Sequence, residues 1–471
     1  MRLVEGLARF ANRQRWPVYY FALAATCFFS IIVPKAVGPW DGLYDHTGTA
    51  LGADFVAFYA GGTMVRRGEA SELYDVYEEI ELQYAIVGED PEGGGAFFLN
   101  PPPYALLMVP IAALPYVPAV ALWWVLGLAL LVASTLHVVR AVNPDAAAPI
   151  RPRHALLFAL GFVPTQIAFA IGQNTFLSLA LSAFAFVALR SGREVLGGAL
   201  VGAMILKPQL ALGFALVLVV KRRWKAVTAA AVVTLSLIGL SVALIPEAWP
   251  GFLASVRGTA QLVRGLEHDF PAFLGLSVPG ALSLLADWAL PRVVDFVGPL
   301  LGIGILVALG MYWHRRPWTP GSRSWDVAMG ATLAAGWLAS PHLLLYDAAL
   351  FLLPAWLLYM RVGRGPAGRP FGGGRLYGWT LLALLGVSLW IQLVSGYLWE
   401  HLPEWGLPRV VPQLVTVALA GWTLAMFREA AALEGAEGEP RADDGGAGTD
   451  GAGAGDADAG ADEDAEAPVP V

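Results

Sequence analysis

Long apolar runs constrain this chain more than any other feature of its sequence. They recur along most of its length as stretches of roughly 18–23 residues, the length at which an α-helix crosses the ~30 Å hydrocarbon core of a bilayer. Of the 471 residues, 57% are hydrophobic and 14% are charged, whereas an average soluble domain is ~45–50% apolar and ~25% charged. These values exclude a soluble enzyme and predict an all-α, polytopic membrane domain over residues 1–428.

Charge divides the sequence into a basic body and an acidic tail. The tail, residues 429–471, carries 13 acidic residues and one basic residue, so the body has 29 basic and 24 acidic residues and a net charge of +5. Gly, Ala, Asp and Glu dominate the tail, which predicts a disordered cytoplasmic segment because it has little to bury. Neither part supports binding of nucleic acid. The single cysteine, Cys27, excludes an intramolecular disulfide and a cysteine-based metal site.

The basic residues of the body gather in six clusters, and Lys and Arg in short loops mark the cytoplasmic side of a membrane. Placing all six clusters inside predicts a multi-pass protein of the cell (inner) membrane, with about twelve crossings and both termini cytoplasmic. The predicted crossings are residues 17–36, 118–139, 154–171, 174–190, 195–206, 209–220, 223–245, 296–313, 325–340, 342–361, 376–397 and 408–427.

Two apolar stretches, 105–114 and 281–290, would place a basic cluster outside if they crossed, so we predict partial helices at the outer surface. The predicted crossings 195–206 and 209–220 have only 12 residues each, about 18 Å of helix. We expect them to meet below the outer surface, so that Lys207 and Pro208 lie within a cavity.

Two longer segments are predicted to be periplasmic loops, residues 36–100 and 246–278. The first contains 12 acidic residues, and its pattern predicts two short amphipathic helices. The first helix covers residues 55–66 and is ended by Gly68. The second covers residues 73–87, with Ser71 as its N-cap.

Asp54, just before the first loop helix, has two interpretations. It is either an N-cap whose carboxylate accepts backbone N–H bonds, or a general base held at the membrane boundary beside aromatic side chains. Tyr59 follows it on the same helix, and Asp75 lies further along the loop.

Other polar residues also fall on the outer side of the predicted topology. Lys207, between two apolar helices, is costly there unless it meets an anion or a cavity, and His342 and Asp347 lie at the outer end of a crossing, where polar groups are functional by default. For His342 and Asp347 the alternative is a mutual pair or a helix cap. Arg257 and Arg264 are seven apart on one helical face and could hold a phosphate or a lipid headgroup.

The remaining candidates lie in a proline-rich block and a turn. Asn100-Pro-Pro-Pro-Tyr104 is either a rigid connector or a substrate contact, and Gly172-Gln-Asn174 is either a satisfied turn or a source of hydrogen bonds. No spacing typical of a metal site occurs in these blocks, so no metal and no cofactor are expected.

Taken in order, these blocks resemble glycosyltransferase family 87, membrane proteins of the GT-C fold that are similar to polyprenyl-phosphate-dependent mannosyltransferases. The resemblance covers roughly residues 50 to 360. Five blocks carry it: Asp54-Phe-Val-Ala-Phe-Tyr-Ala-Gly-Gly62, Asn100-Pro-Pro-Pro-Tyr104, Gly172-Gln-Asn174, Leu206-Lys-Pro-Gln209 with Arg222-Arg-Trp224, and Ser340-Pro-His342 with Tyr346-Asp347.

The resemblance implies inverting transfer of a sugar, a hexose such as mannose, from a polyprenyl-phosphate donor to a hydroxyl of a lipid or glycan acceptor on the periplasmic face. Asp54 matches the position of the general base, with Asp75 and Asp347 in reserve. Lys207 and His342, with Arg257, are implied to bind the donor phosphate. The implied substrate contacts are Tyr59, Asp75, Tyr104, Gln173, Asn174, Gln209 and Asp347.

Two other functions fit a chain with many helices and buried polar residues. A carrier for a lipid-linked sugar would share these features, although transporters often show two related halves with broken helices, and no convincing internal repeat occurs here. An oligosaccharide ligase or polymerase would act on the same face with arginine-rich outer loops, whereas the second loop here has only Arg257 and Arg264.

Overall fold

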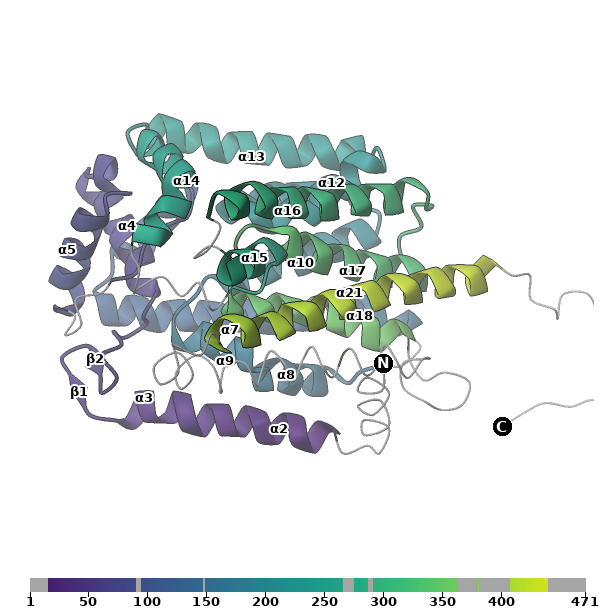
Figure 1. The fold of residues 1–471 in the computed structure, drawn as a ribbon, viewed down its shortest axis with the longest axis horizontal. Helices are drawn as coiled ribbons and strands as arrows, with labels where there is room; N and C mark the ends of the chain where they lie inside the picture. Colours follow the sequence, from purple (N-terminus) through teal and green to yellow (C-terminus); the bar gives the residue numbers. More distant parts are fainter. Residues whose placement is uncertain are drawn as a thin grey trace, which may run out of the picture.

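The computed structural model describes residues 16–89, 95–146, 149–265, 275–286, 291–362, 380 and 407–438. These residues form a bundle of helices that lie side by side, with shorter segments gathered at one end (Figure 1). We call this the outer end. The bundle is made of α2 (Trp16–Cys27), α7 (Tyr116–Val142), α8 (Pro152–Gly161), α9 (Val163–Ala170), α10 (Thr175–Arg190), α11 (Glu194–Ala203), α12 (Leu212–Val220), α13 (Trp224–Leu244), α16 (Pro291–His314), α17 (Arg323–Ala339), α18 (Leu352–Val362) and α21 (Leu407–Gly438).

Several helices carry a stretch long and apolar enough to cross a bilayer. In the described part of the chain there are five, or six if α8 and α9, which meet at a bend of 64°, are counted as one broken span. The chain is therefore a helical, multi-pass membrane protein. The prediction of twelve crossings is not confirmed, because α10, α11, α12 and α17 are shorter than a full span and predicted crossing 376–397 lies, apart from Thr380, outside the described residues.

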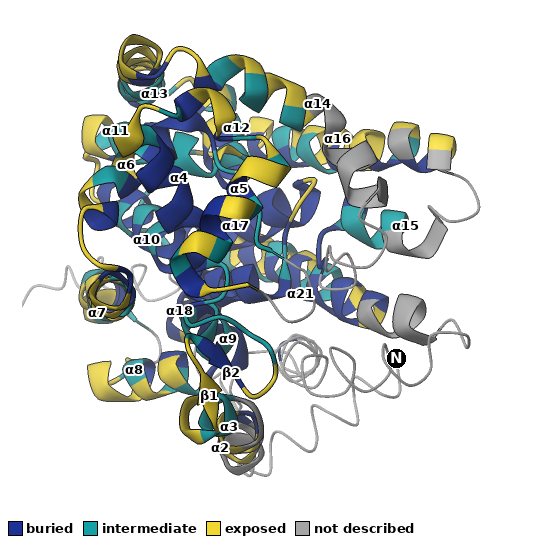
Figure 2. Cartoon of the chain, turned by 90° about the vertical axis from the view of Figure 1, so that its left-hand side faces the viewer, coloured by how far each residue is buried: buried dark blue, intermediate teal, exposed yellow. Residues whose placement is uncertain are grey.

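The interior of the bundle is formed by α10, α17 and α18, whereas α7, α8 and α13 turn exposed apolar faces outward (Figure 2). Every residue from Ser324 to the end of α17 is buried. Small residues let α11 and α13 pack closely. A side chain on Gly198 or Gly202 of α11 would collide with the backbone of Ala226 or Ala230 on α13. Such small residues four apart on each helix are typical of tight helix packing in membranes.

The outer end holds α4 (Phe55–Arg67), α5 (Val76–Val87), α6 (Pro102–Ala112), α14 (Ala248–Gly265) and α15 (Val278–Ala286). The predicted helix 55–66 is confirmed as α4, and Gly68 ends it in the left-handed conformation, with φ of 79°. For the second loop helix the predicted cap is wrong. Residues Ala70–Glu72 form a 3₁₀ turn, and Asp75 caps α5 by accepting bonds from the backbone N–H groups of Tyr77 and Glu78.

The two predicted partial helices correspond to α6 and α15. Helix α6 begins three residues earlier than predicted, because Pro102 and Pro103 occupy its first turn, where a missing N–H does no harm. Helix α15 is described from Val278 to Ala286, and the last predicted residues, 287–290, lie outside the described residues.

The first outer loop also contains a small antiparallel hairpin that an all-α prediction misses. Strand β1 (Trp40–Asp41) pairs with β2 (Tyr44–Asp45). Lys35, at the end of α3 (Val33–Val37), donates to Asp45, Thr47 and Thr49 over 2.7–3.2 Å and so fastens the hairpin to the first helix.

The opposite end of the bundle, which we call the basic end, collects the ends of α7, α10, α17 and α18. Asp326, at the start of α17, accepts from Arg361 over 2.5 Å and from Arg190 over 3.1 Å. Arg190 also pairs with Asp145 over 2.9 Å. Asp326 and Arg361 are both fully buried. Arg190 also donates to the Ala141 carbonyl of α7 over 2.7 Å, so the network joins α7, α10, α17 and α18.

The first ten residues of the predicted acidic tail are helical. Helix α21 continues to Gly438, so residues 429–438 are helical, and within them Glu434 pairs with Arg316 over 2.6 Å. The rest of the predicted tail lies outside the described residues.

Candidate functional site

A cavity of about 510 Å³ opens at the outer end of the bundle. Six segments line it: the start of α4, residues 95–101, the turn between α9 and α10, the junction between α11 and α12, α14, and residues 341–347. Its polar lining is Asp54, Asn100, Gln173, Asn174, Lys207, Gln209, Ser255, His342, Tyr346 and Asp347. The cavity therefore gathers seven of the predicted site residues: Asp54, Lys207, His342, Gln173, Asn174, Gln209 and Asp347.

Asp54 occupies the N-cap position of α4, yet its side chain makes no capping hydrogen bond. Its Oδ2 accepts instead from Nε2 of Gln173 over 2.5 Å, across 119 residues of sequence. The interpretation of Asp54 as a simple helix cap is therefore wrong. The carboxylate faces the cavity and is held there by a neutral amide.

The turn that carries Gln173 depends on Gly172. Its φ is +66°, and a Cβ at this position would lie 2.7 Å from the carbonyl oxygen of Gly52 and 2.7 Å from Cβ of Phe55. Only glycine allows the turn to approach the start of α4 this closely. Trp123 fixes the turn from the other side by donating to the Gly172 carbonyl over 2.8 Å.

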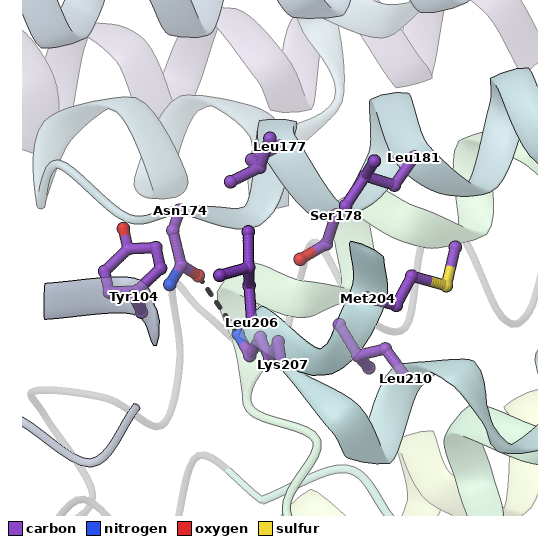
Figure 3. Close-up of a pocket in the computed structure, with 9 residues that line it drawn as sticks. All are labelled: Tyr104, Asn174, Leu177, Ser178, Leu181, Met204, Leu206, Lys207 and Leu210. Atoms are coloured by element: carbon purple, nitrogen blue, oxygen red, sulfur yellow. Dashed lines mark hydrogen bonds between the residues drawn. The ribbon is translucent and has the colours of Figure 1, made fainter. Parts of the chain in front are cut away.

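Lys207 lies between two short 3₁₀ helices, η4 (Met204–Leu206) and η5 (Pro208–Ala211), at the junction of α11 and α12. Both Lys207 and Pro208 line the cavity, as predicted. Nζ of Lys207 contacts both carboxylate oxygens of Asp347 over 2.7 and 2.9 Å, and it donates a longer bond to Asn174 over 3.4 Å. Figure 3 shows the bond to Asn174, with Tyr104 beside that amide.

Asp347 is held from two sides. Besides Lys207, it accepts from the Thr175 hydroxyl over 3.0 Å, and both Asp347 and Thr175 are buried. These contacts commit the Asp347 carboxylate to holding Lys207 and Thr175 at the cavity.

Burial has the largest effect on the Asp54 carboxylate. Removal of water from the carboxylate raises its pKa above the ordinary value of 3.8, although the bond from Gln173 and the charge of Lys207 partly oppose the rise. A raised pKa makes the ionised carboxylate a stronger base.

His342 lies at the mouth of the cavity and is exposed to it. The protein atoms around its imidazole partly desolvate the ring, which lowers its pKa. The side chain is therefore suited to hydrogen bonding as a neutral imidazole rather than to providing a fixed positive charge. Gln209 also lines the cavity, with its side chain partly exposed.

Arg257 lies on α14, next to Ser255 and Val256, which line the cavity. Its backbone is thus close to the site, while its side chain is outside the described part of the chain.

Three predicted site residues do not line the cavity. The Tyr59 hydroxyl donates to the Leu114 carbonyl over 2.7 Å and joins α4 to the end of α6. Tyr104 is fully buried and packs edge-on against Phe58. Asp75 is exposed and caps α5, so we do not retain it as a substrate contact or reserve base.

Three polar residues that line the cavity were absent from the predicted set: Asn100, Ser255 and Tyr346. Asn100 donates to the Leu206 carbonyl over 3.1 Å and so attaches the segment before α6 to the Lys207 junction. Thr175, which was not predicted either, anchors Asp347 from behind the lining. Asn100 and Tyr346 stand within motifs singled out in the sequence and Thr175 directly follows one, and that position was the available signal. Among the described residues, no three His, Cys, Asp or Glu side chains form a group that could hold a metal ion.

The chain matches the model of a known protein family. The family model described as Glycosyltransferase family 87 matches residues 98–341, about half of the chain. Neither the search of curated proteins nor the search of solved structures gave a match. The matched segment includes the turn of Gln173 and the Lys207 junction.

Proposed function

Because this chain belongs to glycosyltransferase family 87, we propose that it moves a sugar, a hexose such as mannose, from a polyprenyl-phosphate donor to an acceptor hydroxyl. The family membership indicates a glycosyltransferase. The donor, the inverting course of the reaction and the lipid or glycan acceptor are part of the proposal. The reaction takes place in the cavity at the outer end, on the periplasmic face of the cell inner membrane, with both termini in the cytoplasm.

The observation that carries the proposal is the position of Asp54. Its Oδ2 is held by Gln173, its pKa is raised by burial, and its side chain faces a cavity large enough for a sugar. A hydroxyl group has a high pKa, so it becomes a good nucleophile only when a base takes its proton as it attacks.

The reaction balances as a single displacement. The acceptor oxygen bonds to the anomeric carbon on the face opposite the donor phosphate, and the bond between that carbon and the phosphate oxygen breaks. The proton of the acceptor hydroxyl passes to Asp54, and the polyprenyl phosphate leaves with the electron pair of the broken bond. Attack from the opposite face inverts the anomeric configuration.

Lys207 is proposed to stabilise the leaving phosphate. Its ammonium is already pre-oriented by Asp347, and its bond to Asn174 is the longest of its three contacts. A phosphate oxygen can replace that contact with the smallest loss of hydrogen-bond energy. A fixed cation stabilises charge most strongly in a site that excludes water. His342 donates a hydrogen bond to the same phosphate, and Arg257 on α14 contributes a second positive charge.

The neutral side chains of the cavity are proposed to bind the sugar. Asn174, released from Lys207, and Gln209 offer both donors and acceptors to hydroxyl groups. Gln173 contacts Asp54 directly, so we assign it to positioning the base rather than to the sugar.

The experiment that tests the proposal uses membranes from cells that lack the protein, complemented with wild type, Asp54→Asn or Asp75→Asn at matched levels. Lipid-linked sugars and their glycosylated products are measured by mass spectrometry. We expect Asp54→Asn to lower product formation by about 10²–10⁴-fold, the range for loss of a general base, and a lipid-linked sugar to accumulate.

Asp75→Asn is the matched control, because it removes an exposed carboxylate from the same loop. It should retain activity. Asp54→Asn should also unfold at a temperature no lower than that of wild type, since a carboxylate whose pKa is raised on folding destabilises the folded state at neutral pH. Normal product levels with Asp54→Asn would contradict the proposal.

A further inference from the structure

A second hollow lies at the basic end, far along the bundle from the cavity described above. It is a groove of about 660 Å³ between the ends of α12 and α16, which lie side by side (Figure 1). Val307 and Met311 of α16 form part of its apolar wall and are 54% and 56% exposed. Lys221, Arg222, His314 and Arg315 form its rim.

Of the charged side chains on this rim, only some have partners within the described part of the protein. Lys221 donates to the carbonyls of Trp313 and Arg316 and so closes the end of α16. Arg223, the next residue but one, is paired with Glu194 and lies over the ring of Trp318. Arg222 and Arg315 are exposed, and no carboxylate in the described part of the chain pairs with either.

The backbone of Arg222 gives a second, independent observation. Its φ is +52°, in the left-handed region that favours glycine. The end of α10 makes the same turn with the same pattern of backbone bonds, and there the equivalent residue is Gly192, with φ of +72°. Arg222 therefore has a strained backbone at a position where the corresponding turn after α10 has glycine. Strain of this kind is often found at functional positions.

We propose that this groove binds an anionic phospholipid of the bilayer. The guanidinium groups of Arg222 and Arg315 hold the phosphate of the headgroup, and an acyl chain lies along Val307 and Met311. Basic pockets between helix ends at the membrane boundary suit such headgroups, and the flat guanidinium group matches phosphate oxygens. The site is independent of the proposed sugar transfer.

The test uses the full chain purified in an uncharged detergent. Native mass spectrometry measures binding of phosphatidylglycerol and of phosphatidylcholine with identical acyl chains. We expect wild type to prefer phosphatidylglycerol, and Arg222→Gly and Arg315→Gln each to weaken that binding by about fivefold without changing the binding of phosphatidylcholine.

Lys225→Gln is the control, because it removes a cation at the same end but outside the groove. It should leave lipid binding unchanged. Arg222→Gly should unfold at the same temperature as wild type or higher, since glycine relieves the strain, so a loss of lipid binding cannot be ascribed to unfolding. Equal binding of the two lipids by wild type would overturn the proposal, and so would an equal loss with Lys225→Gln, which indicates diffuse surface charge.

Discussion

At Asp54 two influences of opposite sign act on one carboxylate. Burial raises its pKa, while the hydrogen bond from Gln173 and the charge of Lys207 lower it. Asp347, which also lines the cavity, is instead tied to an ammonium and a hydroxyl. The two carboxylates of the cavity therefore have different partners, a neutral amide for Asp54 and a cation with a hydroxyl for Asp347.

The pH dependence of transfer follows from the raised pKa of Asp54. The base must be ionised, so activity should fall as the pH drops through a midpoint above 3.8. Gln173→Leu removes a bond to the charged form, and such bonds are worth ~1.5–3 kcal/mol, where ~1.4 kcal/mol is one pKa unit. We therefore expect the acidic midpoint of kcat/KM to move upward by about one to two units.

The pH profile of purified enzyme in detergent checks this expectation. Gln209→Leu is the matched control, because it removes an amide from the same cavity without touching Asp54, and its acidic midpoint should equal that of wild type. If the profiles of Gln173→Leu and wild type coincide, Gln173 does not act through Asp54.

At the scale of the element, short turns decide the geometry of the site. The turn between α9 and α10 carries Gln173 and Asn174, and the break between α11 and α12 carries Lys207. Both are places where a helix stops inside the protein. Polar groups at such breaks are tolerated because they line a cavity.

Gly172→Ala tests this role of the first turn. The substitution forces a side chain into a left-handed backbone, at ~1 kcal/mol, and directs its Cβ against Gly52 and Phe55. We expect a loss of stability of about 1–3 kcal/mol and a fall in kcat, because the turn must move away from α4 and take Gln173 with it.

Gly192→Ala provides the comparison for thermal unfolding and kinetics. Gly192 also has a left-handed backbone, with nothing within 4 Å of the added Cβ. It should show the backbone strain alone and an unchanged kcat. Equal effects of the two variants would mean that close packing of the Gly172 turn has no part in activity.

The whole molecule has two ends with different chemistry. The outer end has the cavity and the short helices, and the basic end has a buried network in which Asp326 joins Arg190 and Arg361. These contacts fix the ends of α7, α10, α17 and α18 against one another, so the outer ends of the same helices keep their spacing around the cavity.

Removing one member of this network should destabilise the whole bundle. Asp326→Asn leaves the fully buried Arg361 without its carboxylate, a change that typically costs ~3–5 kcal/mol. We expect a clear fall in unfolding temperature in detergent, with transfer activity preserved at lower temperature.

Glu69→Gln, which breaks the exposed pair of Arg67 and Glu69 at 4.0 Å, should have almost no effect, since exposed pairs contribute ~0–1 kcal/mol. If Asp326→Asn unfolds at the same temperature as Glu69→Gln, the buried network does not hold the bundle together.

The class of the protein and much of its local structure could be predicted from the order of its residues. Apolar runs predicted a helical membrane protein, Gly68 the end of α4, and ordered motifs the family. These features depend on neighbours along the chain, through hydrophobic length, backbone conformation and short-range caps, so one sequence contains them.

Which polar side chains meet could not be predicted before the fold was known. The contacts of Gln173 with Asp54, Lys207 with Asp347 and Thr175 with Asp347 span 119, 140 and 172 residues. The fold also decides that Asp75 caps a helix while Asp54, equally placed for capping, does not. A carboxylate accepts hydrogen bonds from the donors that lie close to it. The packing of helices that are distant in sequence determines which donors lie there.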